Sequence, residues 1–386
     1  MVSRRDVLKA SGVGLTVGLA GCSGSRGPGD GTTDDGAGGG NGDDDGGNGG
    51  SDTPAGTAAE TETPLPGEDV NVGVIYARGG LGDQSFSDAA NRGVRRARDE
   101  LGISFDNAEP QSTSDFNSFQ RRFARSTDPD YDLIICVGFE HVAPLQENAN
   151  TFSDQRWAQL DAVVDRSNVE NWVYAEEQGS YLVGQAAAQL STMEFSAGPS
   201  STDPSNTVLG FVGGIEAPVV QAFEAGFRAG AQSVDSGFEV LSSYVGDFSS
   251  PGAAEETAQS MIDQGADVLY HGAGAGGVGV FRAAQNNGVF AFGADSRQSE
   301  TVPDFANVIL GSMVKGVDTS AFRAVEHVVN DDFQGGNTFE LGAGEGGFEL
   351  IWSDSIGTEV PQEVKDAAAA TKEEIAAGNI DVPATP

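Results

Sequence analysis

Short apolar runs alternate with amphipathic stretches from residue 69 onward. Apolar runs of this length between helical segments are typical of strands that are buried on both faces of a parallel sheet. The pattern predicts strands over residues 70–76, 132–137, 158–164, 171–175, 207–212, 238–245, 267–271, 289–293 and 307–313. It predicts helices over residues 85–101, 115–126, 179–193, 217–234, 252–264, 275–287 and 317–332.

The alternating segment is too long for one small sheet. A chain of this length divides more naturally into two cores than it enlarges one. The sequence therefore predicts an α/β fold with two doubly wound parallel-sheet lobes, each covered by helices on both faces.

The first residues are typical of an export signal. The paired arginines Arg4 and Arg5 precede an apolar run, residues 10–20, that is too short to span a bilayer. Twin arginines indicate the Tat route, and a small residue before Cys22 matches a lipobox. We expect residues 1–22 to be a Tat signal with lipidation at Cys22; a plain secretory signal with a chance cysteine is the alternative.

Residues 23–68 are rich in Gly, Asp and Thr and poor in apolar side chains. Such a segment buries too little apolar surface to offset the entropy of ordering, so we expect a disordered tether. No later segment holds 18 consecutive apolar residues, so the lipid anchor is the only membrane attachment that we expect.

Acidic residues outnumber basic ones by 58 to 21, which gives a formal net charge of −37. This balance argues against nucleic-acid binding, which needs a basic surface. Only four lysines are present, and abundant acid with little lysine indicates adaptation to high salt, so we expect a halophilic source. With two cysteines, Cys22 and Cys136, a disulfide framework and a Cys-rich zinc site are excluded, and Cys136 is expected in the core.

Polar, glycine-containing segments recur in a fixed order along the predicted lobes. They are residues 80–87, 177–184, 211–216, 223–227, 244–248, 264–268, 271–274, 293–296 and 312–315. Together they resemble the basic membrane protein family, also called the purine nucleoside receptor A-like family. Its members are lipid-anchored substrate-binding proteins of ABC transporters with a type I periplasmic-binding-protein fold, and the resemblance covers about residues 70–352.

The resemblance implies a monomeric extracytoplasmic protein that captures a nucleoside between its lobes and delivers it to an ABC permease. We expect residues 69–176 plus 315–333 in lobe 1, and residues 177–314 plus 334–386 in lobe 2. A three-strand hinge would join the lobes and let them close as rigid bodies. No cofactor or metal is expected.

Two aromatic residues match the positions between which relatives sandwich the base, Phe86 and Phe248. Stacking contributes about 1–3 kcal/mol per base and tolerates different bases. The alternative is that both are core phenylalanines. Asp83 and Ser85, in the segment before Phe86, are also expected to contact the ligand.

The expected sugar contacts are Asp295, Lys315 and Gly274. Asp295 follows an apolar strand, where a carboxylate can accept from both ribose hydroxyls, and Lys315 matches the family's ribose-contacting lysine. Gly274 matches a glycine at which the backbone approaches the sugar. The alternatives are a surface lysine paired with Asp318 and a simple turn at Gly274.

The base-reading end departs from the family pattern. Ala77 and Ala143 stand where relatives often have acids, and Ser87 replaces a frequent Asn. Glu140 or His141 could substitute for the acid expected near position 143. Purine specificity is therefore open, and pyrimidine or modified nucleosides, or another small ligand such as a sugar, remain alternatives.

An enzyme is the main rival class, and the sequence argues against it. The chain has three histidines, and His271, after a predicted strand, would either line the cleft or cap a turn. No dinucleotide fingerprint, P-loop lysine, nucleophile elbow or metal-ligand spacing is present. A receptor that presents its ligand to a signalling protein would use the same binding chemistry and stays open.

Overall fold

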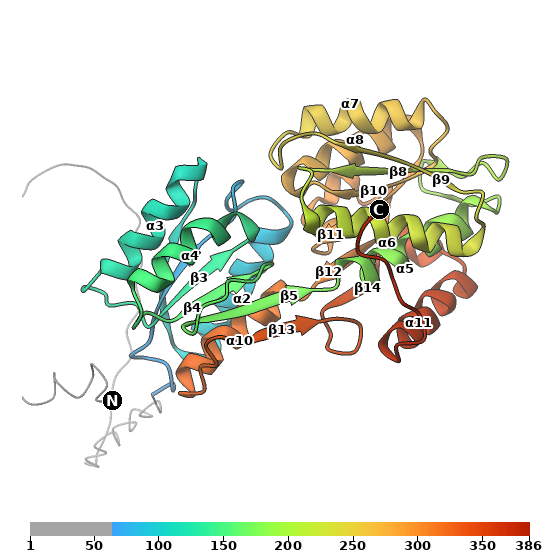
Figure 1. Cartoon of the computed structure of the whole chain (residues 1–386). Helices are drawn as coiled ribbons and strands as arrows, with labels where there is room; N and C mark the ends of the chain where they lie inside the picture. Colours follow the sequence, from blue (N-terminus) through green and yellow to red (C-terminus); the bar gives the residue numbers. More distant parts are fainter. Residues whose placement is uncertain (1–63) are drawn as a thin grey trace, which may run out of the picture. The chain divides into compact units, whose positions relative to one another are not determined.

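The computed structural model describes residues 64–386 (Figure 1). The expected Tat signal, Cys22 and most of the expected tether lie outside these residues. The last five residues of that tether are not disordered. Residues 64–68 form a turn in which the Gly67 N–H donates to the Leu101 carbonyl at 2.7 Å, so the ordered body begins before residue 69.

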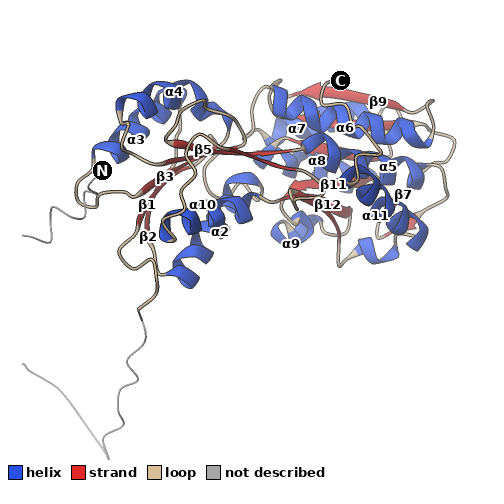
Figure 2. Cartoon of the chain, turned by 60° about the horizontal axis from the view of Figure 1, so that its bottom comes forward, coloured by secondary structure: helices blue, strands red, loops and turns tan. Residues whose placement is uncertain are grey.

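Lobe 1 contains a six-stranded parallel sheet with the order β13-β5-β4-β3-β1-β2. Its strands are β1 Asn71–Ile75, β2 Ser104–Ala108, β3 Leu133–Val137, β4 Trp157–Leu160, β5 Val169–Tyr174 and β13 Thr338–Leu341. Its helices are α2 Phe86–Leu101, α3 Thr113–Arg125, α4 Val142–Thr151 and α10 Val317–Val329. Alternate residues of β3 enter two different apolar clusters, one with α2 and α10 and the other with α3 and α4. The sheet is therefore covered on both faces (Figure 2).

Lobe 2 contains a second six-stranded sheet with the order β14-β12-β11-β10-β8-β9, in which only the edge strand β14 is antiparallel. Its strands are β8 Val208–Gly213, β9 Glu239–Tyr244, β10 Val268–Gly272, β11 Phe290–Asp295, β12 Ile309–Lys315 and β14 Phe348–Trp352. Its helices are α5 Glu176–Ser191, α6 Pro218–Val234, α7 Pro251–Ile262, α8 Gly277–Asn287, α9 Gln298–Thr301 and α11 Gln362–Ala376. The two-stranded ribbon of β6 Ser196–Ala197 and β7 Ser200–Ser201 completes it.

Helices α5 and α6 pack with their backbones in contact. A Cβ atom at Gly184 would collide with the Phe227 carbonyl, and one at Gly226 would collide with the Glu177 carbonyl. This close approach explains the glycines in two of the family segments without reference to a ligand.

The chain crosses between the lobes three times in the described residues. The crossings lie between β5 and α5, at Gly316 between β12 and α10, and over residues 342–347 between β13 and β14 (Figure 1). The expected third crossing, at residue 334, would put β13 in lobe 2. That boundary is wrong, because β13 pairs with β5 in the sheet of lobe 1 and the chain crosses only after it. This short edge strand is half-exposed and lacks the apolar run that marks a buried strand.

Each predicted strand and helix is present, with ends shifted by a few residues. In the two six-stranded sheets the pattern missed β2, β13 and β14, which are half-exposed edge strands whose polar residues hide the apolar signal. It also missed the ribbon of β6 and β7 and the helices α4, α9 and α11. Cys136 is buried in β3, as expected. Among residues 64–386, no helix combines the length and apolar character that a membrane span requires.

Candidate ligand-binding site

A cavity lies where the carboxyl ends of strands from both lobes meet. The empty space between its walls is about 670 Å³, including a part open to solvent. Ligands collect at this edge of open α/β sheets because the connecting loops converge there. The lining residues are Ala77, Arg78, Gly79, Asp83, Phe86, Gly138, Phe139, Glu140 and Asp161 from lobe 1, and Val219, Val220, Phe223, Phe248, Gly272, Gly274, Ala275, Asp295 and Lys315 from lobe 2.

Seven of the eight residues predicted to bind the ligand line this cavity, and the eighth, Ser85, contacts one of them. The seven are Asp83, Phe86, Glu140, Phe248, Gly274, Asp295 and Lys315. Their contacts with a ligand remain a prediction. Their convergence from six loops or strand ends is a property of the fold.

Two rings from opposite lobes face the cavity, those of Phe86 and Phe248. Both are partly exposed, so neither is an ordinary core phenylalanine. Phe86 begins α2, and Phe248 lies against Gly214, where a Cβ atom would collide with its ring. A third ring, that of Phe139, meets Phe248 edge-on with the ring centroids 6.3 Å apart.

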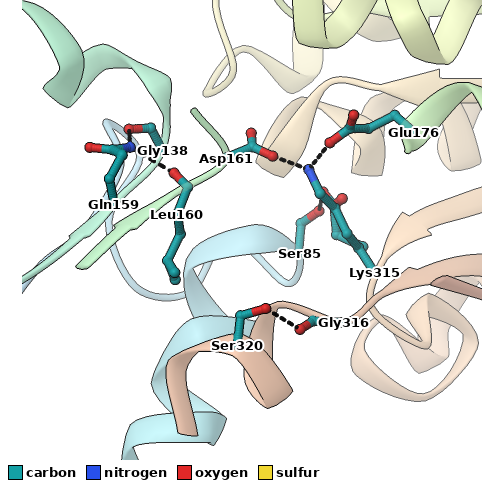
Figure 3. Close-up of polar contacts among 10 residues, drawn as sticks. Ser85, Gly138, Gln159, Leu160, Asp161, Glu176, Lys315, Gly316 and Ser320 are labelled. Atoms are coloured by element: carbon teal, nitrogen blue, oxygen red, sulfur yellow. Dashed lines mark hydrogen bonds and ion pairs between the residues drawn. The ribbon is translucent and has the colours of Figure 1, made fainter. Parts of the chain in front are cut away.

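Lys315 is the centre of a buried ion cluster. Its side chain is 2% exposed, and its Nζ pairs with a carboxylate oxygen of Asp161 and, at 2.6 Å, with Oε1 of Glu176 (Figure 3). The alternative of a surface lysine paired with Asp318 is therefore wrong. Lys315 ends β12 and Glu176 begins α5, so both stand at crossings between the lobes, while Asp161 follows β4.

Burial and charge act against each other in this cluster. Burial opposes the ammonium form, but the carboxylates of Asp161, Glu176 and Asp295 hold the pKa of Lys315 above its ordinary value. Burial raises the pKa of Glu176 to about 8 despite the attraction of Lys315, and it also raises the pKa of Asp295. We call these four residues, Asp161, Glu176, Asp295 and Lys315, the Lys315 cluster; it has three carboxyl groups for one ammonium group.

Asp295 also joins the two lobes. Its Oδ2 accepts from the Ser85 hydroxyl at 2.7 Å, and the Ser296 hydroxyl donates to the Ser85 carbonyl at 2.9 Å. Arg92 Nη2 donates to the Ser296 hydroxyl at 2.9 Å. We call the residues of these contacts the interlobe latch, together with Gln298 and Thr301, which donate to the Gln84 carbonyl.

The carboxylate of Asp83 is occupied by the backbone. Its oxygens accept from the N–H groups of Ser85, Ser87 and Asp88 at 2.8–3.2 Å, at the start of α2. Burial nevertheless raises the pKa of Asp83 to about 6. Although it lines the cavity, Asp83 mainly orients the loop that carries Phe86.

The structure separates the candidates for the base-reading acid. Ala77 lines the cavity, whereas Ala143 lies exposed on α4 and does not. His141 is fully buried, with Nδ1 bonded to Gln120 and Nε2 to the Tyr76 carbonyl, so it cannot substitute. Glu140 does line the cavity, paired with Arg78 at 3.1 Å.

His271 does not line the cavity. Its Nε2 bonds to Gln298 at 2.8 Å, and its Nδ1 accepts from the Ala273 N–H, so it fixes the turn after β10. Burial lowers the pKa of His271 to about 4, which keeps the ring neutral. No group of His, Cys, Asp and Glu suited to a metal ion occurs in the part of the chain that the structure describes.

Sequence reasoning missed three charged residues of the site. Asp161 was hidden because the predicted strand ran on to residue 164, whereas β4 ends at Leu160 and Asp161 has a positive φ of 71°. Glu176 lies before the predicted helix start, and Arg78 lies in the glycine-rich turn after β1. A polar residue directly after a short apolar run is the signal that would have found Asp161.

Comparison with known proteins agrees with this arrangement. Residues 70–385 match the Bmp family, described as ABC transporter substrate-binding protein PnrA-like. The chain belongs to this family. An uncharacterized lipoprotein of Pyrococcus furiosus is 32% identical over 305 residues, which cover 76% of this chain and 72% of that protein.

Two further relatives are informative. The ABC transporter nucleoside-binding protein BmpA of Lactococcus lactis is 27% identical over 85% of this chain and 92% of its own length. The crystal structure of an ABC transporter solute-binding protein from Aeropyrum pernix matches with a TM-score of 0.70 and 27% identity, over 81% of this chain and 94% of that chain. The fold is thus the type I periplasmic-binding-protein fold of the Bmp family.

Proposed function

We propose that this protein is an extracytoplasmic, lipid-anchored binding protein that captures a nucleoside between its lobes and delivers it to an ABC permease. The observation that carries the proposal is a cavity lined by aromatic rings from both lobes and by a buried Lys–carboxylate cluster. Family membership supports a substrate-binding role, and the names of two relatives support a nucleoside and a lipid anchor.

The aromatic rings account for binding of the base. Phe86 from lobe 1 and Phe248 from lobe 2 both line the cavity, so a flat base between them would contact both lobes. Such contacts contribute about 1–3 kcal/mol per base. Because each lobe supplies one ring, the full stacking energy is available only in the closed state.

The Lys315 cluster accounts for binding of the ribose. Oδ2 of Asp295 accepts from Ser85, which leaves Oδ1 to accept from ribose hydroxyls. The Lys315 ammonium lies 5.0 Å from the centroid of the Phe86 ring, so a sugar attached to a stacked base lies beside it. Hydroxyl groups both donate and accept, and they can therefore bind the acids and the ammonium together.

Ligand binding then favours closure. A ligand shifts a conformational equilibrium only by binding one state better than the other. A nucleoside that contacts Phe86 in one lobe and Phe248 and Asp295 in the other meets this requirement. The permease would distinguish the closed, loaded protein by the relative positions of its lobes.

Calorimetry at molar salt against nucleosides, free bases and ribose tests the proposal. We expect ribosides to bind, and we expect Phe86→Ala and Phe248→Ala each to weaken binding by about tenfold or more. Phe105→Ala is the matched control, because Phe105 lies on the edge strand β2 outside the cavity. Absence of binding by every nucleoside refutes the function, and equal binding of free bases and ribosides refutes the ribose assignment.

A further inference from the structure

One ion pair that lines the cavity has no role yet in the proposed binding of the base and the ribose. Six charged side chains line the cavity. Asp161, Asp295 and Lys315 belong to the Lys315 cluster, and Asp83 accepts three backbone N–H groups. The two that remain are Arg78 and Glu140, which pair with each other.

The pair is placed by two neighbouring strands. Arg78 follows β1 and Glu140 follows β3, and these strands are hydrogen-bonded to each other, so the two loops emerge side by side. Arg78 Nη2 lies 3.1 Å from Glu140 Oε1, with the side chains 34% and 15% exposed. Phe139, directly before Glu140, contacts the Phe248 ring across the cavity. The pair therefore borders the aromatic part of the cavity, where the proposed function places the base.

The pair is electrostatically separate from the Lys315 cluster. Burial raises the pKa of Glu140, Arg78 opposes that rise, and Asp247 adds to it. The charges that act on Lys315 come instead from Asp161, Glu176 and Asp295. The cavity therefore has two polar centres, the Arg78–Glu140 pair and the Lys315 cluster, together with aromatic rings. This arrangement suits a ligand that carries polar groups at both ends and a flat ring at one end.

The pair also retains hydrogen-bonding capacity. A guanidinium group has five N–H donors, and a carboxylate has two acceptor oxygens, of which Oε1 faces Arg78. The pair thus places donors of Arg78 beside the two acceptor oxygens of Glu140, whose carboxylate also accepts from the Arg78 backbone N–H. A base that fits these groups fully must present one acceptor followed by two donors.

We propose that Arg78 and Glu140 read the edge of the base and select guanine. This inference rests on the proposed function, because it assumes a nucleoside in the cavity. Guanine presents the O6 acceptor, the N1–H donor and the exocyclic amine donor in that order. Hypoxanthine lacks the amine, so it satisfies two of the three groups on the pair. Adenine has a donor at the exocyclic N6 amine and an acceptor at N1, so in the same orientation it opposes both the Arg78 donor and the first Glu140 acceptor.

The pair takes over the role that the family pattern gives to acids at positions 77 and 143. Here both positions are alanine, and Ala143 does not reach the cavity. A lone acid offers acceptors only. The Arg–Glu pair adds a donor for O6, which makes guanosine the preferred ligand over inosine.

Calorimetry at molar salt with guanosine, inosine and adenosine tests the inference. We expect the unmodified protein to bind guanosine about tenfold or more tightly than inosine, since hydrogen bonds to charged groups are strong. Glu140→Gln replaces one acceptor by an amide donor that opposes the guanine amine, so the preference should fall below about threefold. Glu255→Gln, which breaks the Arg282–Glu255 pair outside the cavity, is the matched control and should leave all affinities unchanged.

A second variant separates reading of the base from loss of structure. Arg78→Gln weakens the donor to O6, so guanosine and inosine should both bind about tenfold more weakly while guanosine stays preferred. A disrupted site would instead lose adenosine to the same extent.

The possible results separate the two proposals. If nucleosides bind without a guanosine preference, or if the preference survives Glu140→Gln, the selection by Arg78 and Glu140 is wrong and the proposed function stands. If no nucleoside binds, both are wrong.

Discussion

Replacing Lys315 by methionine removes the one ammonium group of a cluster that contains three carboxyl groups. The side chain is 2% exposed, and its Nζ lies 5.0 Å from the centroid of the Phe86 ring and 4.6 Å from that of Tyr174. Methionine is an unbranched apolar side chain of similar volume that can fill the same space beside these rings. The substitution therefore isolates the loss of charge from the loss of packing.

The expected cost follows from the burial of the partners. Removing one member of a buried ion pair destabilises a protein by about 3–5 kcal/mol, because the other charge is left uncompensated. Here Asp161 and Glu176 both lose their partner, and Asp295 loses a nearby cation. We expect Lys315→Met to lower the free energy of unfolding by about 3–5 kcal/mol near neutral pH.

The cost should depend on pH with a definite sign. At low pH Glu176 and Asp295 are protonated with or without Lys315, so the ammonium stabilises them little. Above the pH at which each ionises beside Lys315, the variant must either bury uncompensated charge or retain protons. The difference in unfolding free energy between the two proteins should therefore grow as the pH rises, and the share that Glu176 contributes should begin near pH 8, because burial raises the pKa of Glu176 to about 8.

Urea denaturation at constant molar salt measures this difference at several pH values. Lys365→Met is the matched control, because Lys365 Nζ makes only an exposed contact with the Thr358 carbonyl, at 3.4 Å. The reasoning is refuted if both variants lose the same stability, or if the cost of Lys315→Met shrinks as the pH rises.

Four further substitutions, in three experiments, test other parts of the site. Glu176→Gln removes a carboxyl group whose pKa is about 8 in the folded protein against an ordinary 4.5, so the fall in thermal midpoint expected between pH 5 and 8 should flatten. Arg92→Leu removes a contact of the interlobe latch, so nucleoside affinity measured by calorimetry should fall by about two- to tenfold; an unchanged affinity contradicts a role in closure. Ala77→Asp should change nucleoside affinity, whereas Ala143→Asp on exposed α4 should not, and equal effects contradict the assignment of the cavity wall.

The central strands and most of the helices beside them were predictable because each carries its own local signal, although α4 was not predicted. β3 and β11 are buried along their whole length, and that burial requires continuous apolar runs. The edge strand β13 has no such requirement, since part of it faces solvent. Its assignment to lobe 1 depends on pairing with β5, which no short stretch of sequence encodes.

The site divides in the same way. Phe86, Phe248 and Asp295 were found because they follow strand ends within segments shared with a family. The partners of Lys315 were not found, because the Lys315–Asp161 pair joins residues 154 apart and two different lobes. A pair of this kind arises only from the three-dimensional arrangement, and in a chain rich in acids the sequence offers many equally plausible partners.

Asp295 connects closure of the lobes to capture of the ligand. One of its carboxylate oxygens accepts from Ser85 in the other lobe, and the positive φ of 63° directs the residue out of the end of β11. Separation of the lobes would break the Ser85 contact, whose hydrogen bond lowers the cost of keeping a carboxylate buried beside the ligand. Asp161 in lobe 1 likewise pairs with the Lys315 ammonium in lobe 2. Closure of the lobes therefore completes the polar end of the cavity. In the open protein, where only lobe 2 contacts the nucleoside, binding should be far weaker than in the closed protein, where both lobes contact it.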